Sequence, residues 1–84
     1  MLTDRSYKEY AMNLTMVEEG REYIISSVDT DDAELNSFLF SLGCYSGEPI
    51  TVVRRSGKNF VVVIKDARYS IDSGLAEAIT VAEG

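Results

Sequence analysis

The sequence predicts a single, mainly β domain: a small, partly open barrel of about five strands with one short α-helix inserted after the first strand. Three observations carry this prediction. The chain has 84 residues, fewer than the roughly 100 to 150 of an ordinary domain, and 45% of them are hydrophobic. Most apolar residues stand in short runs rich in β-branched side chains. Only one stretch spaces them as an amphipathic helix does.

The first strand is expected at "REYIISSV", residues 21–28, which is rich in β formers. Its alternation places Tyr23 and Ile25 on one face and Ile24 on the other. It follows a segment, "MLTDRSYKEYAMN" at 1–13, that shows no clean periodicity and is interpreted as an N-terminal arm. The barrel domain is therefore expected to span residues 14–84.

The helix is expected over 32–42. Asp31 and Glu34 fit a capping box, in which each side chain satisfies an unpaired backbone N–H at the helix start. Gly43 stands where a helix ends in a left-handed residue, a conformation that glycine adopts without steric cost. One apolar stripe runs along this helix and comprises Leu35, Phe38, Leu39 and Leu42.

The remaining strands follow a turn at Gly47. In "PITVVRR", Pro49 is acceptable because it holds the first position of a strand. "SGKN" predicts a hairpin turn, and the apolar residues of "FVVVIK" predict a central strand buried on both faces. The chain then continues with a short strand "RYSI", one helical turn "SGLAEA" that carries Leu75 and Ala76 inward, and a last strand "ITV" at 79–81.

Composition excludes several classes of function. The chain has one cysteine and no histidine, so an internal disulfide, a zinc finger and a Cys/His nucleophile pair are all excluded. No Gly-rich phosphate loop or nucleophile elbow is present, so no catalytic residues and no cofactor are predicted. The net charge of −6 argues against nucleic-acid binding.

The longest apolar run, Phe60 to Ile64, is far short of the ~20 residues that span a bilayer, so no insertion into a membrane is expected. The N-terminus places charged residues where a signal peptide needs apolar ones, and a cytoplasmic location is expected by default.

The order of these features resembles the FeoA family of ferrous-iron transport accessory proteins. The matching residues are Leu14 and Gly20, the helix pattern Leu35, Leu39, Leu42 and Gly43, then Gly47, Ile50 and Val52, and finally Ala76, Ile79 and Val81. The resemblance covers roughly residues 14 to 82. This sequence departs from the family in having Ser46 where members often have proline and Asp72 where a basic residue is common.

The resemblance implies an SH3-like β-barrel without established catalytic activity. It also implies the partner: FeoB, the membrane transporter of Fe²⁺, with its cytosolic GTP-binding domain. Two alternatives from other classes stay open. One is a stand-alone domain that binds and responds to divalent metals without acting through FeoB. The other is a nucleic-acid-binding barrel, which is disfavoured because no strand interleaves aromatic and basic residues.

Two features of the sequence, a group of acidic residues and a single cysteine, raise the question of a metal or redox site. Asp29, Asp31, Asp32 and Glu34 offer oxygen ligands, but capping and the helix dipole already explain acids at this place. Cys44 follows the helix stop, and a lone free cysteine is more often a buried packing residue than a ligand. No metal ligands are therefore predicted.

The predicted partner surface combines a turn with a hairpin. Tyr45 lies in the turn 43–47, where an aromatic ring either contacts a partner or closes the barrel end. Arg54, Arg55 and Lys58 make the following hairpin basic on an acidic chain, which suits electrostatic steering of a partner, although solvated strand faces and edge protection also explain them. The oligomeric state stays open.

Overall fold

A computed structural model describes residues 12–83 of the chain. Within this range six strands form one antiparallel sheet in the order β1-β6-β2-β3-β4-β5. The elements in chain order are β1 (Met12–Asn13), the 3₁₀ helix η1 (Leu14–Met16), β2 (Glu22–Val28), α2 (Ala33–Leu42), β3 (Pro49–Ser56), β4 (Asn59–Ile64), β5 (Ala67–Asp72), α3 (Ser73–Glu77) and β6 (Ile79–Glu83). None of the helices in this range is long and apolar enough to cross a bilayer.

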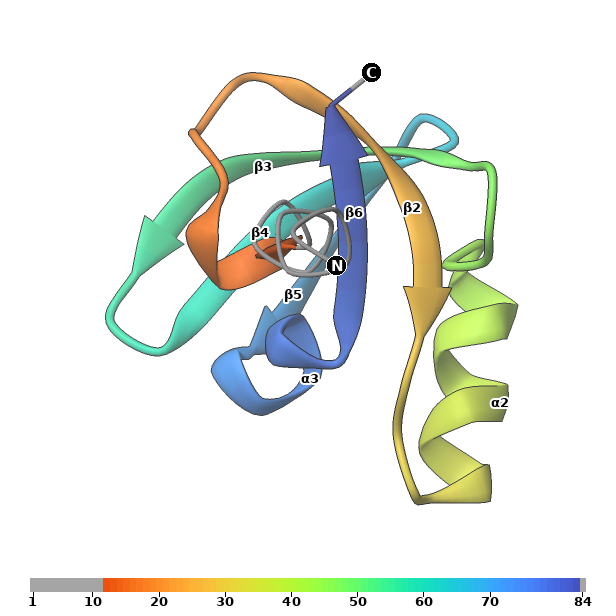
Figure 1. Cartoon of the computed structure of the whole chain (residues 1–84). Helices are drawn as coiled ribbons and strands as arrows, with labels where there is room; N and C mark the ends of the chain where they lie inside the picture. Colours follow the sequence, from red (N-terminus) through yellow and green to blue (C-terminus); the bar gives the residue numbers. More distant parts are fainter. Residues whose placement is uncertain (1–11, 84) are drawn as a thin grey trace, which may run out of the picture.

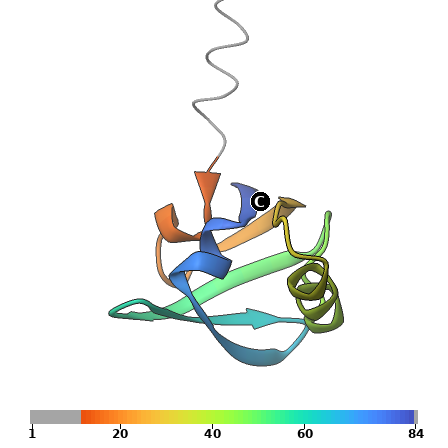
Figure 2. The same cartoon turned by 90° about the horizontal axis from the view of Figure 1, so that it is seen from below.

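The sheet curls into a partly open barrel. β6 and β2 lie across β3, β4 and β5 in Figure 1, so the two halves of one sheet face each other. Two irregularities help to bend it: the pairing shifts in register between Ile25 and Ser27 and again between Val52 and Arg54. Bulges of this kind bend a strand and increase its twist. Seen along a second direction, α2 lies at one side of the barrel (Figure 2).

The core lies between the two halves of the sheet. Strand alternation fills it, because successive side chains of a strand point to opposite faces. Tyr23 and Ile25 of β2 lie on one face, as predicted, and this face is buried, with 2% and 1% exposure of the two residues. The other buried apolar residues are Leu14, Val17, Leu39, Cys44, Ile50, Val52, Phe60, Val62, Ile64, Ile71, Ala76, Ile79 and Val81.

Several expectations need correction. The barrel has one strand more than expected, because Met12 and Asn13, assigned to the arm, pair with Val81 and Thr80 of β6. The helix therefore follows the second strand. The rest of the arm, residues 1–11, lies outside the described range. β4 is not buried on both faces, because Val61 and Val63 are partly exposed. A strand is buried on both faces when helices pack on both sides of its sheet. Among residues 12–83, no helix packs in this way over the face that carries Val61 and Val63.

The cap of α2 is Asp32 and not Asp31. The Asp32 carboxylate accepts hydrogen bonds from the backbone N–H groups of Glu34, at 2.8 Å, and Leu35, at 3.3 Å. Because the helix begins at Ala33, Asp32 stands in the flanking position from which a side chain can reach those groups.

Gly43 ends α2 as the sequence predicts, with a left-handed φ of 98°. The turn also needs the lack of a side chain, because a Cβ here would lie 3.0 Å from the Ile64 side chain and 3.2 Å from that of Lys65. The end of α2 can therefore lie close to Ile64 and Lys65 only because residue 43 has no side chain.

Replacing Gly43 by alanine should lower the free energy of unfolding by about 1–3 kcal/mol through backbone strain alone, and by more if Ile64 cannot move. Urea denaturation would measure the change. Gly47→Ala is the matched control, because its φ of 93° carries similar strain while nothing lies within 4 Å of the added Cβ. Equal losses in the two variants would show that the contact with Ile64 costs nothing.

Candidate partner-binding surfaces

Helix α2 exposes much of its apolar surface. Leu39 is its one fully buried side chain, whereas Leu35, Phe38 and Phe40 are 37%, 48% and 64% exposed. The helix projects past the end of β2 (Figure 1), which leaves its N-terminal half without a strand to pack against. The predicted apolar stripe is therefore only partly buried, and Leu35 and Phe38 in it face solvent. Leu35 and Phe38 are three positions apart and therefore lie on the same flank of the helix. Neighbouring exposed apolar residues mark interaction sites more often than single ones do.

Phe38 and Phe40 belong to different flanks of α2. Residues two apart in a helix are separated by about 200° around its axis, because a turn takes 3.6 residues. The flank of Phe40 borders a groove of about 280 Å³ between α2, the end of β2 and the turn after the helix. The groove is lined by Ser26, Ser27, Val28, Asn36, Phe40, Cys44, Tyr45 and Ser46. We refer to it as the α2 groove.

Tyr45, the aromatic residue predicted for a partner surface, is half-buried and forms one wall of the α2 groove. Its ring packs against Phe40, with the ring centroids 4.9 Å apart and the planes tilted by 40°. The Lys65 ammonium also lies near this ring, 5.3 Å from its centroid. Tyr45 therefore packs against its neighbours with one part of its ring and leaves another part exposed.

Lys65 ties this wall to the β4–β5 turn. Its ammonium lies 3.0 Å from a carboxylate oxygen of Glu48. Two hydrogen bonds of its ammonium raise the pKa of Lys65 above its usual value: the one to Tyr45 contributes most, followed by the one to Glu48. The stabilisation that the ammonium gives is therefore complete below the ordinary lysine pKa and is lost as the pH rises through the raised value.

The backbone of the turn is also fixed. The N–H of Gly47 donates to the carbonyl of Ile25 at 2.8 Å, and the N–H of Ile25 donates to the carbonyl of Glu48 at 2.9 Å. Within the turn, the N–H of Glu48 donates to the carbonyl of Tyr45 at 3.1 Å. The groove wall is therefore held in place before any partner arrives.

The structure does not bring the basic hairpin to Tyr45. Arg54 and Lys58 lie near the β3–β4 turn, whereas Tyr45 precedes the start of β3. The start of β3 and the β3–β4 turn lie at opposite ends of this strand (Figure 1). An eight-residue strand at about 3.3 Å per residue separates them by roughly 25 Å. One small partner segment cannot contact both.

Arg55 has a structural role. Its guanidinium donates a hydrogen bond to the carbonyl of Val17 and lies 5.4 Å from the centroid of the Phe60 ring. It therefore fastens the segment after η1 to the hairpin. Arg54 and Lys58 are exposed, and within residues 12–83 neither takes part in an ion pair.

The acidic cluster before α2 is used locally. Asp32 caps the helix, and Asp29 accepts a hydrogen bond of 3.4 Å from the hydroxyl of Ser27. In the part of the chain that the structure describes, no group of three or more cysteine, aspartate and glutamate side chains is placed to hold a metal ion.

Cys44 is a packing residue. It is 3% exposed, and burial raises the pKa of its thiol to about 11. The thiolate is the form that binds metals and attacks electrophiles, so this thiol is poorly suited to either task.

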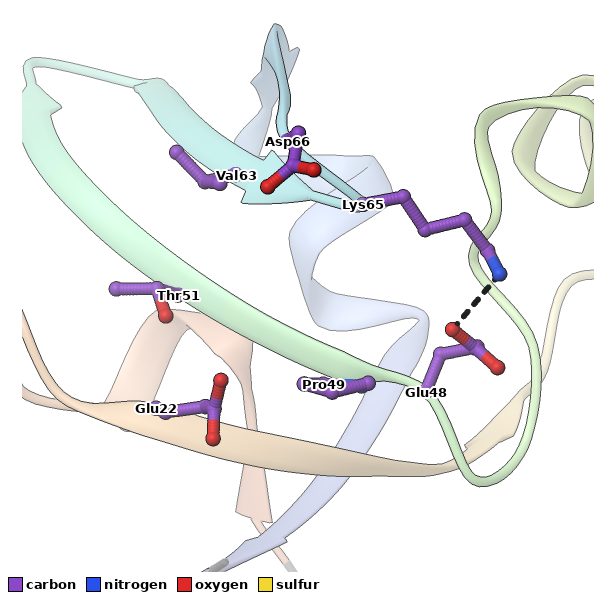
Figure 3. A pocket seen from close by; sticks show the side chains of 7 residues that line it. All are labelled: Glu22, Glu48, Pro49, Thr51, Val63, Lys65 and Asp66. Carbon is purple, nitrogen blue, oxygen red and sulfur yellow. Dashed lines mark ion pairs between the residues drawn. The ribbon is translucent and has the colours of Figure 1, made fainter.

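A second groove, of about 300 Å³, lies on the outer face of the sheet (Figure 3). Thr51 and Val63 form its floor in one cross-strand row with Glu22, while Pro49, Glu48, Lys65 and Asp66 surround them. The Lys65–Glu48 ion pair closes one end. Sequence reasoning missed this groove because it expected β4 to be covered on both faces. Val61 and Val63 alternate with the polar residues Asn59 and Lys65, whereas Val62 alternates with Phe60 and Ile64. This difference between the two faces is the local signal that could have indicated the exposed one.

Comparison with known proteins agrees with this architecture. A FeoA crystal structure described as an iron uptake regulatory protein is 20% identical, with 86% of this chain and 96% of that chain covered and a TM-score of 0.77. FeoA from Stenotrophomonas maltophilia in complex with zinc, described as a prokaryotic SH3 domain protein, is 21% identical over 83% and 88% of the chains, with a TM-score of 0.75. FeoA from Chlorobium tepidum is 23% identical over 86% and 70%, with a TM-score of 0.79.

The fold is therefore SH3-like, as the sequence resemblance implied. It also recurs in a manganese-dependent transcriptional repressor, 21% identical, where 88% of this chain matches 42% of that longer one with a TM-score of 0.77. Among curated proteins, no sequence matches this chain. The sequence model of the FeoA domain matches residues 12–83, nearly the whole chain. Because this match covers both the helix that carries the α2 groove and all six strands, the chain belongs to the FeoA family.

Proposed function

We propose that this protein is a non-enzymatic, cytoplasmic accessory protein of ferrous iron uptake that binds the cytosolic part of FeoB and regulates the transporter. Membership of the FeoA family supports the role in ferrous iron transport. The observation that carries the binding role is the α2 groove, where the aromatic pair Phe40 and Tyr45 stands at the surface instead of in the core.

The chemistry of the groove suits a protein partner. Its volume of about 280 Å³ lies just below the range of sites for small molecules and cofactors, and it has room for one or two large side chains. Aromatic residues in well-packed positions carry much of the energy of protein interfaces. Because hydrogen bonds already fix the turn at Tyr45, binding costs little conformational entropy there.

The basic hairpin has a smaller part in this proposal. Arg54 and Lys58 lie too far from Tyr45 to share one contact, so they act by attracting an acidic surface of the partner over a distance. Charges of this kind change the association rate and its salt dependence more than the dissociation rate.

Titration of the purified protein into the isolated cytosolic GTP-binding domain of FeoB from the same source tests the proposal, with and without nucleotide and at two salt concentrations. We expect binding that Phe40→Ala weakens at least about tenfold. Phe38→Ala is the matched control, because Phe38 is an exposed aromatic residue of the same helix on its other flank. Equal losses in both variants would remove the α2 groove from the proposal.

The Arg54→Glu, Lys58→Glu double variant should bind more slowly and with less salt dependence, while its dissociation rate stays close to that of the unaltered protein. Arg55 is left intact in this variant because its contact with Val17 is structural. If the unaltered protein shows no binding to the GTP-binding domain or to intact FeoB, the proposed function is wrong.

The alternative of a stand-alone metal-responsive domain receives no specific support. Within residues 12–83 no set of side chains is arranged to hold a metal ion.

A further inference from the structure

Strand β5 forms one edge of the sheet. Among the described residues it pairs only with β4, and its other main contact is α3, the helix that directly follows it. Natural edge strands are commonly protected by proline, a bulge, extreme shortness or charged side chains. β5 has six residues, contains no proline and pairs with β4 without a register shift. It does carry charges, Arg68 and Asp72, but they are of opposite sign and can therefore pair with those of a second copy. Its free edge can therefore accept another strand.

The backbone groups on that edge can be identified. Lys65 and Asp66 form a two-residue turn with positive φ at both positions, and such a turn is flanked by a hydrogen-bonded pair, here Ile64 and Ala67. Hydrogen-bonded pairs recur at every second residue, so Ala67, Tyr69 and Ile71 direct their backbone groups toward β4. The N–H and C=O groups of Arg68, Ser70 and Asp72 consequently face away from the sheet.

We propose that two copies of this chain pair antiparallel through β5, with the two-fold axis at Ser70 and with Arg68 of each copy opposite Asp72 of the other. The side chains of these three residues are exposed. Within residues 12–83, Arg68 takes part in no ion pair. The proposal does not depend on the proposed function, because the pairing uses none of the residues of the α2 groove.

Charge favours this register over its neighbours. An axis at Arg68 places the two arginines opposite each other, and an axis at Asp72 does the same with the two aspartates. An axis at Tyr69 sets Asp72 of one copy beside Asp66 of the other. An axis at Ile71 would set Asp72 opposite Ser70 and leave Arg68 and Asp72 without an opposite charge. Like charges directly opposite destabilise a strand pair, and opposite charges stabilise it. With the axis at Ser70, both charged pairs are complementary.

The hydrogen-bond inventory also fits. The two Ser70 residues exchange N–H to carbonyl bonds across the axis, and the N–H of each Asp72 donates to the carbonyl of Arg68 in the other copy. The carbonyl of Asp72 takes no part, because an N-cap carbonyl accepts the first bond of its own helix, α3. Four backbone hydrogen bonds join the copies. An interface of one strand per copy is small, so the association is expected to be weak.

Sedimentation equilibrium and ¹⁵N NMR of the whole chain, at concentrations up to about 1 mM, test the pairing. We expect the mass to rise with concentration from 9.3 kDa toward twice that value. The amide signals of Arg68, Ser70 and Asp72 should shift with concentration. Ser70→Pro should abolish both effects, because it removes a donor that β4 does not use, and its circular dichroism should stay unchanged.

A charge exchange gives the sharper test. Arg68→Glu and Asp72→Lys should each weaken self-association at least about tenfold, because both charged pairs become like-charged. An equimolar mixture of the two variants should associate again. In the mixed pair, the substituted positions face each other with opposite charges, and the unaltered Asp72 of the first variant faces the unaltered Arg68 of the second. Asp72→Asn, which keeps a good helix cap, separates loss of charge from damage to α3.

The proposal is wrong if the unaltered chain stays monomeric at about 1 mM. It is also wrong if the chain dimerises but the mixed variants do not recover, or if Phe40→Ala abolishes dimerisation while Ser70→Pro leaves it intact. The last result would place the contact between copies in the α2 groove.

Discussion

Leu39→Ala should lower the free energy of unfolding by about 3 kcal/mol. Leu39 is completely buried, and it is the one side chain of α2 that lies fully in the core. A helix of ten residues is only marginally stable in water and depends on its tertiary contacts. Removing this anchor therefore leaves a cavity and also loosens the helix. Urea denaturation measures the first effect, and hydrogen exchange of the α2 amides measures the second.

Phe38→Ala is the control for this prediction. Phe38 is 48% exposed, so its truncation removes less buried area and should cost less than about 1 kcal/mol. If both variants lose the same stability, α2 is held by its whole apolar surface and not by Leu39. The comparison also matters for the proposed function, because it separates residues that hold the helix from residues that present it.

Most of the barrel could be predicted from local patterns. Gly43 and Gly47 mark turns whose left-handed φ angles few other residues adopt, and both turns are found where the sequence places them. The alternation of Tyr23, Ile24 and Ile25 fixes the inward face of β2. Each of these signals depends on a few neighbouring residues, which is why the sequence alone was sufficient.

The candidate sites depend on distances across the fold, which local patterns do not contain. The spacing of Leu35 and Phe38 correctly predicts a helix face, but it does not show that the helix extends past the strand that would cover them. Tyr45 and Arg54 are nine positions apart in the chain, yet the extended strand β3 holds them well apart, because Tyr45 precedes its start and Arg54 lies near its end. β1 was missed because two residues carry no periodicity.

Cys44 should react with a thiol reagent at least about tenfold more slowly than an unstructured cysteine at pH 8. Burial raises its pKa from an ordinary value of 9.0 to about 11, and two pKa units correspond to about 100-fold less thiolate below both values. This loss of thiolate is only partly offset by the greater nucleophilicity of a more basic thiolate. Labelling the folded protein with Ellman's reagent measures the rate. The same protein in concentrated urea is the control, and it should react at the rate of a small thiol.

The same burial makes stability fall at alkaline pH. The unfolded thiol ionises from about pH 9, whereas the folded one resists ionisation until about pH 11, so stability is complete below pH 9 and decreases as the pH rises between these values. Cys44→Ala should lack this component of the decrease.

Rapid labelling of the folded protein at pH 8 would contradict the prediction of slow labelling. It would mean that the α2 groove, which Cys44 lines, opens to solvent. A groove that opens in this way would offer a partner a deeper pocket, so the labelling rate also tests whether the aromatic wall of Phe40 and Tyr45 is as rigid as its contacts imply.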